Sequence, residues 1–167
     1  TAISGAVDAS VVVSAAKTAL ADITGALNTS HDGGYVFSGV NTDVKPIADY
    51  QAGGASAAVN SAFQTWFGFP KSDPQAGYIT GAQMDAFMTT QVEPLFLGAG
   101  WNGLMSAASS HPVQSRITLS ETLDTSVSAN ETGFRKALFA AALTAEFFEG
   151  SLGASAKSAV ALKAVTL

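Results

Sequence analysis

Two histidines, His31 and His111, are the first residues of this sequence that could do chemistry, because imidazole serves as a general base and a metal ligand near neutral pH. Each is followed by a turn residue, Asp32 in the first case and Pro112 in the second. No second ligand stands at metal-binding spacing from either histidine. The two serines before His111 do not make a catalytic triad, because a triad is defined by geometry and not by adjacency. We expect both histidines to lie in surface loops without a catalytic role.

Paired carboxylates are the second candidate, because two carboxyl groups can act as acid and base in hydrolysis. The available pairs are Asp22 with Asp32 and Glu146 with Glu149. Glu146 and Glu149 stand three residues apart near the predicted end of a helix, a spacing typical of a solvated helix face. No glycine-rich loop has phosphate-binding spacing before a helix. The chain has no cysteine, which excludes thiol catalysis and thiolate metal sites. We predict no active site, no metal and no cofactor.

The composition is that of a folded, soluble protein. The 167 residues are 47% hydrophobic and 13% charged, which suffices for one domain with a core. The net charge of −5 and the pI near 4.7 argue against a nucleic-acid partner, which would require clustered lysine and arginine. No uninterrupted apolar run reaches the roughly 18 residues of a membrane span. The absence of cysteine fits a cytosolic and an exported protein equally well.

The first predicted element is a helix over residues 1 to about 30. Small and apolar residues recur there at alternating steps of four and three, the spacing of a helix that packs along another helix. They are Ala2, Ala6, Ala9, Val13, Ala16, Leu20, Ile23 and Leu27, and those from Val13 onward form the packing seam. This pattern fits an ordinary core helix and one rod of a longer bundle. Because helical patterns reach both ends, we expect a trimmed piece of a longer protein.

A corner follows this helix between Leu27 and Pro46. Gly33 and Gly34 are expected to end the helix, because glycine adopts a positive φ at little cost. The aromatic run 35–37 is predicted as a short strand, and a turn-rich exit follows. The structural residues of this corner are Gly33, Gly34, Tyr35, Phe37, Gly39, Asn41 and Asp43. We therefore predict that a long helix becomes a strand here.

Residues 49–110 differ from both flanks, because glycines and prolines divide them into short pieces. Helices are predicted over 55–67 and 80–92, the second with Thr80 as N-cap and Gln83 as its capping-box partner. A small core is expected from Phe63, Trp66, Phe67, Phe69, Phe87, Met88, Phe96 and Trp101. We interpret 49–110 as a helical, aromatic-rich insert packed on a core domain formed by 1–48 and 111–167.

Residues 115–127 alternate between apolar and polar types. This alternation predicts an exposed pair of strands, with a bend at Ser120 and Glu121. A strand in this range could pair with residues 35–37 and form one antiparallel sheet across the long gap in sequence.

A long helix is predicted to start at Ser128. Glu131 has capping-box spacing from Ser128, and Val127 and Thr132 occupy the positions of a hydrophobic staple. The helix-start residues are Ser128, Asn130, Glu131, Phe134 and Arg135. One helix face is expected from Phe134, Leu138, Ala141, Ala145 and Phe148. Gly150 and Gly153 break this helix, and a further helix is predicted over 154–167. The predicted fold class is α+β and mainly helical.

Two segments of the chain resemble one known family. The corner, with its Tyr-Val-Phe-Ser-Gly and Asn-Thr-Asp pieces, is similar to the Gly-Arg-Tyr-Leu-Phe-Ala-Gly-Thr-Lys-Thr-Asp corner of flagellar hook-associated protein 3, the FlgL-type hook–filament junction family. Gly34, Val40 and Asn41 depart from that run. Residues 126–135 resemble the Ala-Asn-Glu-Glu-Gly-Phe-Arg start of the family's first C-terminal core helix. The Gln-Ser-Arg-Ile and Asp-Thr-Ser-Val pieces within 101–127 resemble its alphaproteobacterial branch.

The resemblance implies a structural protein and no enzyme. Its fold would be a flagellin-like core of long antiparallel helices with a small antiparallel β element. Such a protein is exported through the flagellar secretion system and joins hook to filament outside the cell. Its partners would be the neighbouring hook-associated protein, flagellin, copies of itself and an export chaperone, with neither nucleic acid nor membrane. The chain with trimmed ends is expected to be monomeric.

Two other functions remain open from the sequence. Flagellin itself shares the helix, strand and helix order. A module that binds a peptide or a glycan through the aromatic insert, around Trp66, Phe69 and Trp101, is a function of a different class.

Overall fold

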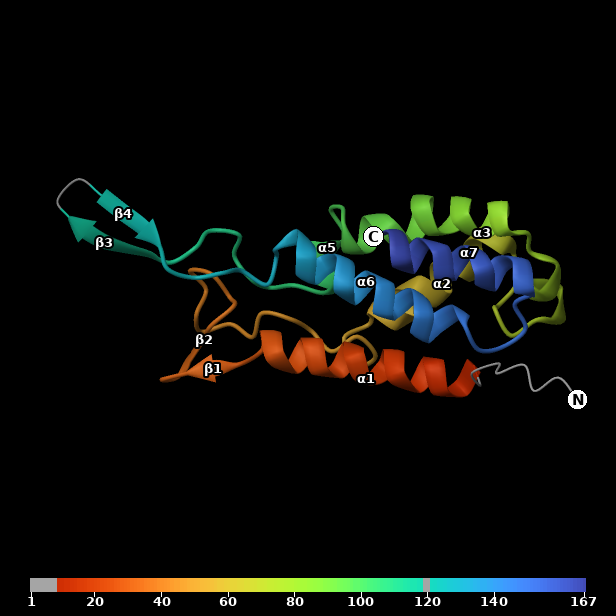
Figure 1. Cartoon of the computed structure of the whole chain (residues 1–167), viewed down its shortest axis with the longest axis horizontal. Helices are drawn as coiled ribbons and strands as arrows, with labels where there is room; N and C mark the ends of the chain where they lie inside the picture. The colour runs from red at the N-terminus through yellow and green to blue at the C-terminus, as the bar shows by residue number, and fades with distance from the viewer. Residues whose placement is uncertain (1–8, 119–120) are drawn as a thin grey trace, which may run out of the picture.

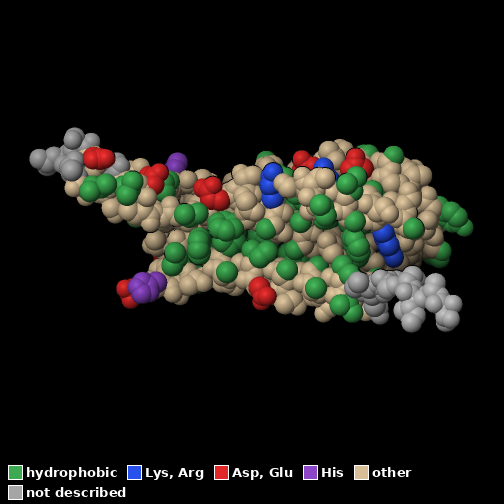
Figure 2. Space-filling model, in the orientation of Figure 1, with side chains coloured by type: hydrophobic (Ala, Val, Ile, Leu, Met, Phe, Trp, Pro, Cys, Tyr) green, Lys and Arg blue, Asp and Glu red, His purple; other side chains and the backbone are tan. Residues whose placement is uncertain are grey.

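The computed structural model describes residues 9–118 and 121–167, which form a mainly helical molecule with two small antiparallel sheets (Figure 1). The molecule is elongated, as its surface in Figure 2 also shows. The helices are α1 (Ala9–Leu27), α2 (Ala55–Phe67), α3 (Gly81–Phe87), α4 (Glu93–Phe96), α5 (Trp101–Leu104), α6 (Thr132–Phe147) and α7 (Ala154–Thr166). A 3₁₀ turn, η1 (Pro74–Tyr78), precedes α3, and a π-helical turn, η2 (Met88–Val92), joins α3 to α4. The strands are β1 (Ser30–His31), β2 (Gly34–Tyr35), β3 (Gln114–Thr118) and β4 (Glu121–Asp124). The predicted mainly helical α+β class is confirmed.

The long helices lie side by side along the molecule. Helix α6 packs against α1 and α7, and α7 packs against α3. Helix α6 runs opposite to both α1 and α7, whereas both hairpins lie at the far end from the start of α1 (Figure 1). Helix α7 begins directly after Gly153, as the sequence predicts.

Helix α1 packs one face against α6. Its buried residues are Val13, Ala16, Leu20, Thr24 and Leu27, while Ile23 is half-buried. The buried stripe moves from the seam position Ile23 to Thr24 because an α-helix has 3.6 residues per turn and drifts away from a strict heptad. Ala2 and Ala6 lie outside the described residues. By length and composition alone, α1 could cross a membrane, and 28% of that stretch is buried within the molecule.

The corner differs from its prediction. Helix α1 ends at Leu27, and Asn28 exchanges two hydrogen bonds with the backbone of Ile47, at 2.8 and 2.9 Å. The glycines belong instead to a hairpin in which β1 pairs with β2 through a two-residue turn at Asp32 and Gly33. Both turn residues have positive φ, 50° and 84°, as a type I′ turn requires. The prediction that Gly33 and Gly34 end a long helix was therefore wrong.

The predicted sheet between the corner and residues 115–127 does not form. Among the residues that the structure describes, strands β3 and β4 pair only with each other, and β2 ends at Tyr35 after pairing with β1. The hairpin β3–β4 is exposed, as predicted, and Figure 1 shows it projecting from the helical body. Ser120 lies outside the described residues. Local hairpins replace the long-range sheet because a short turn closes each pair at a smaller loss of chain entropy.

Residues 49–110 share one hydrophobic core with the flanking helices. Phe63 of α2 contacts Phe87 of α3 and Phe147 of α6, with ring centroids 5.4 and 5.8 Å apart. Phe96 stacks on Phe139 of α6 at 5.1 Å. Helix α2 has the predicted bounds, and the capping box of Thr80 and Gln83 is confirmed. Apart from Trp66 and Tyr78, which are exposed, the aromatic rings of this range therefore pack into or against the core around α6, and the prediction that Trp66 belongs to this core was wrong.

Candidate functional site

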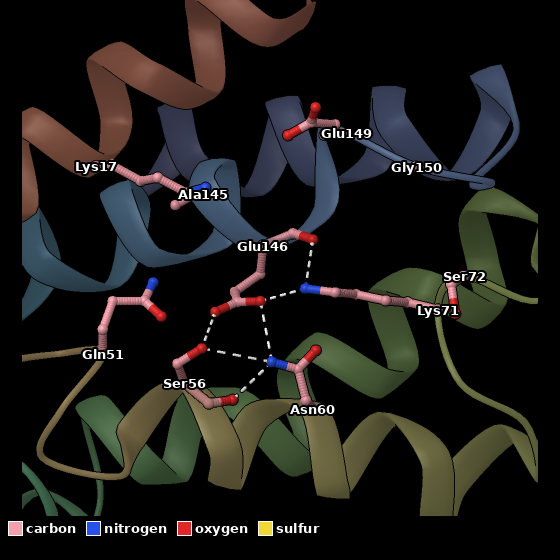
Figure 3. A pocket seen from close by; sticks show the side chains of 10 residues that line it. All are labelled: Lys17, Gln51, Ser56, Asn60, Lys71, Ser72, Ala145, Glu146, Glu149 and Gly150. Atoms are coloured by element: carbon pink, nitrogen blue, oxygen red, sulfur yellow. Dashed lines mark hydrogen bonds and ion pairs between the residues drawn. The ribbon is translucent and has the colours of Figure 1, made fainter.

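Glu146 lies in the last turn of α6 and is buried, with an exposed fraction of 5%. It follows Leu143 and precedes Phe147, both of which pack into the core. The carboxylate faces α2 and the segment that carries Lys71 (Figure 3). The prediction that Glu146 and Glu149 share a solvated face was wrong for Glu146, whereas Glu149 is exposed. Helix α6 is covered on several sides, so even a charged position of this helix becomes internal.

Four side chains donate hydrogen bonds to the Glu146 carboxylate. Oε1 accepts from the hydroxyls of Tyr50 at 3.1 Å and Ser56 at 2.5 Å. Oε2 accepts from Asn60 Nδ2 at 3.1 Å and forms an ion pair with Lys71 Nζ. Lys71 Nζ also donates to the Glu146 carbonyl oxygen at 3.1 Å. The carboxylate thus links α6 to α2 and to the segment that follows α2.

The environment of Glu146 determines its charge state. Burial acts to raise the pKa of Glu146, but the hydrogen bonds from Lys71, Ser56 and Asn60 and the charge of Lys71 outweigh it and lower the pKa below its ordinary value. Burial, the Glu146 charge and the hydrogen bond to Glu146 raise the pKa of Tyr50. Near neutral pH the site therefore holds a carboxylate, an ammonium group and a neutral phenol.

A pocket of about 390 Å³ opens beside this group, with Lys17, Gln51 and Glu149 on its lining (Figure 3). A general base needs a free lone pair aimed at the substrate, and a general acid needs a proton that it can give up. Each Glu146 oxygen already accepts two hydrogen bonds, so the carboxylate is fully occupied. The geometry supports a structural ion pair and not an acid–base pair.

The corner and the helix-start segment, residues 126–135, meet in the structure. The backbone N–H of Ala129 donates to the carbonyl of Phe37 at 2.7 Å. The rings of Phe37 and Phe134 meet edge to face, with centroids 5.9 Å apart. The two segments that carry the family resemblance are thus in direct contact, although about 90 residues separate them in the chain.

Residues 109–111 lie between these two segments and bond to both. Ser109 N donates to the carbonyl of Ser38 at 2.9 Å, and Val40 N donates to the carbonyl of His111 at 3.0 Å. Gly39 is buried between them with a φ of 61°, and a Cβ at Gly39 would lie 2.4 Å from the Ser109 carbonyl oxygen. A side chain is excluded at this position by both the conformation and the space.

Ser128 does not cap α6. Its hydroxyl donates to the Ser109 carbonyl at 2.7 Å and accepts from Asn130 N at 3.1 Å. Helix α6 begins only at Thr132, with Glu131 at the N-cap and no side-chain capping bond, and Val127 is exposed. The predicted capping box and staple were therefore wrong. The Ser128 hydroxyl oxygen accepts from a residue that precedes the helix, because α6 begins at Thr132 and not directly after Ser128.

Asn130 uses every hydrogen-bonding atom of its side chain. Its Oδ1 accepts from Trp101 Nε1 at 2.7 Å and from Ser106 Oγ at 2.5 Å. Its Nδ2 donates to the Ala108 carbonyl at 2.9 Å and to Ser110 Oγ at 3.0 Å. Asn130 therefore fixes α5 and the segment after it against the start of α6.

Arg135 binds backbone carbonyls in the same region. Its Nε donates to the Phe96 carbonyl at 2.7 Å and its Nη2 to the Gly98 carbonyl at 3.0 Å, while the guanidinium lies over the Trp101 ring at 5.3 Å. Burial lowers the pKa of Arg135 from its usual range, but arginine stays protonated at any physiological pH. Arg135 is a link between α6 and the end of α4.

The remaining candidate side chains are exposed. His31 and His111 are exposed, and His31 Nε2 lies 3.4 Å from a carboxylate oxygen of the adjacent Asp32. Asn41 and Asp43 of the corner are exposed as well. Among residues 9–118 and 121–167, no three His, Cys, Asp or Glu side chains gather in a way that could hold a metal ion.

Comparison with known protein families, with curated proteins and with solved structures found no match for this chain.

Proposed function

We propose that this chain is a structural subunit of the bacterial flagellum and joins hook to filament. The observation that carries the proposal is the contact between the corner and the helix-start segment, through Ala129, Phe37 and Phe134. The family resemblance rests on these two segments. Two unrelated similarities of sequence would have no reason to fall on segments that touch each other.

The arrangement of the long helices supports the same proposal. In Figure 1, α1 and α6 run antiparallel beside each other, with the corner at the end of one and the helix-start segment at the beginning of the other. The seam residues Val13, Ala16, Leu20 and Leu27 are buried on this side of α1. Within the described residues, no other element covers the opposite side of α1, which carries small residues that include exposed Ala15 and half-buried Ala19. Small residues permit close approach of a neighbouring helix in an assembly.

The proposal assigns the polar groups a structural role. Asn130, Arg135 and Ser128 hold the 96–110 segment on α6, and Gly39 permits the close approach of the corner to residues 109–111. The subunit would be exported with the help of a chaperone and would assemble outside the cell with a hook-associated protein, flagellin and its own copies. It would have no enzymatic activity.

Deletion of the gene tests this proposal. The mutant should make hooks without filaments and should lose unpolymerised flagellin to the medium, because filament growth would lack its attachment point. Electron microscopy of the cells and immunoblots of the medium measure the two effects, and the wild-type gene supplied in trans is the control that should restore filaments. Normal filaments in the deletion mutant would contradict the proposal.

A filament subunit of the flagellin type is the nearest alternative, because the order of elements is shared. Immunogold labelling separates the two. Label confined to the end of the hook supports the junction protein, whereas label along whole filaments supports flagellin.

A further inference from the structure

A shallow groove of about 500 Å³ lies on the outer surface of α2, η1 and α3. Trp66, Gln75, Tyr78 and Gln83 are four of its lining residues. Half-buried Phe67 and buried Ile79 also line the groove and pack against the core. The groove contains none of the corner or helix-start residues, so it is independent of the proposed function.

The exposed aromatic residues of the chain gather in this groove. Every Phe, Tyr and Trp of the sequence falls within the described residues, and only Trp66 and Tyr78 are exposed, at 42% and 87%. Both line the same groove. Large aromatic rings are usually buried, because the burial of each ring removes a large apolar area from water. Two exposed rings at one site therefore indicate a surface that stacks on a ligand.

The absence of charged residues from the groove lining indicates an uncharged ligand. None of the residues that line the groove is charged, although the chain as a whole carries −5. The Gln75 amide makes no hydrogen bond within the described residues, and Gln83 uses only Oε1, in its capping box, which leaves Nε2 free. Free amides offer both donors and acceptors. The groove thus suits an uncharged ligand with an apolar face and many hydroxyl groups.

We propose that this groove binds a neutral oligosaccharide. The carbon–hydrogen face of a sugar ring stacks on Trp66 and Tyr78, and the sugar hydroxyls bond to the amides of Gln75 and Gln83. A glycan site of this kind does not include Trp101, which is 1% exposed and bonded to Asn130. The aromatic group expected from the sequence around Trp66, Phe69 and Trp101 is therefore divided between a surface groove and the core.

Titration of the purified chain with cellohexaose, chitohexaose and laminarihexaose tests the site. Binding is followed by calorimetry and by tryptophan fluorescence, since ligand contact shields Trp66 while Trp101 stays buried. We expect at least one sugar to bind saturably, and Tyr78→Ala to weaken that binding by about five- to tenfold through loss of one stacking partner. Gln75→Ala should weaken it as well. Val165→Ala, which truncates an exposed apolar residue of α7 outside the groove, is the matched control and should bind as the wild type does.

Three results would overturn the proposal. The first is no saturable binding of any of these sugars at millimolar concentration. The second is binding that Tyr78→Ala and Trp66→Phe leave unchanged, which would place the sugar elsewhere. The third is binding of a deca-proline peptide in place of the sugars, because aromatic grooves also receive polyproline helices. Far-UV circular dichroism of each variant confirms that a loss of binding is not a loss of fold.

Discussion

Replacing Lys71 by Met is the most direct test of the ion pair at the end of α6. Lys71 Nζ is the only cation bonded to Glu146 within the part of the chain that the structure describes. Methionine keeps much of the aliphatic length of lysine and removes the charge. The variant leaves Glu146 buried with three neutral donors, Tyr50, Ser56 and Asn60. The free energy of unfolding should fall, because the carboxylate loses its counter-charge.

The size of the effect follows from the exposure of the two partners. An exposed ion pair contributes about 0–1 kcal/mol, and removing one partner of a fully buried pair costs about 3–5 kcal/mol. The Glu146 side chain is 5% exposed and the Lys71 side chain 31% exposed. Since Glu146 keeps its neutral hydrogen bonds, we expect a loss of about 2–3 kcal/mol. For a chain of this size, that lowers the melting temperature by about 4–12 °C.

Urea unfolding followed by tryptophan fluorescence measures this loss, with Lys17→Met as the matched control. Lys17 lines the same pocket, is exposed and has no ion pair within the described residues. The control should change stability by less than about 0.5 kcal/mol. A double-mutant cycle of Lys71→Met with Glu146→Gln should give a coupling of about 1–2 kcal/mol. If Lys71→Met costs no more than Lys17→Met, the ion pair is no more than a surface contact and our reasoning on Glu146 fails.

Three further predictions concern other parts of the fold. Because the pKa of Tyr50 is raised in the folded state, its contribution to stability is complete below the ordinary value of 10.0 and is lost as the pH rises above it. The free energy of unfolding should fall by up to about 1.4 kcal/mol per pH unit above pH 10, and Tyr50→Phe should reduce this slope while Tyr78→Phe, at an exposed site, should not. Asn130→Ala should cost about 2–3 kcal/mol, since it leaves the buried Trp101 indole N–H without its acceptor. Asn102→Ala, at an exposed position, is its control, and equal unfolding midpoints in urea would contradict the role of Asn130. Gly39→Ala should cost about 2–4 kcal/mol through left-handed strain and the clash with Ser109, whereas Gly33→Ala, also at positive φ but in open space, should cost about 1–2 kcal/mol by thermal unfolding. Similar losses for both glycine variants would show that space at Gly39 is not limiting.

Local signals predicted the local structure well. The bounds of α2 follow from its composition between glycines, and the capping box at Thr80 and Gln83 forms as predicted. The capping box depends on residues within one turn of each other, and the bounds of α2 on one continuous 13-residue segment. Helix propensity, capping and glycine breaks act between residues that are close in sequence, so these features can be predicted from the sequence alone.

Long-range contacts were missed because the sequence does not display them. Glu146 looked like a surface residue because its partner Lys71 stands 75 positions away. Ser128 looked like an N-cap because its spacing from Glu131 is visible in the sequence, whereas the later start of α6 at Thr132 and the bond from Ser128 to the Ser109 carbonyl, 19 positions earlier, are not. The capping-box pattern at Ser128 and the carboxylate at Glu146 each have a local and a tertiary use, and only packing selects between them.

The distribution of satisfied polar groups separates structural sites from a binding surface in this chain. Glu146 and Asn130 use all of their hydrogen-bonding atoms within the fold, which leaves none for a substrate. Gln75 and the free Nε2 of Gln83 keep unused capacity, and they stand beside the two exposed aromatic rings. A buried polar group without a hydrogen-bond partner has a desolvation cost, whereas an exposed polar group bonds to water and remains available to a ligand. The unused amides beside Trp66 and Tyr78 therefore support the proposed sugar site, whereas the hydrogen bonds of Glu146 and Asn130 join parts of the fold.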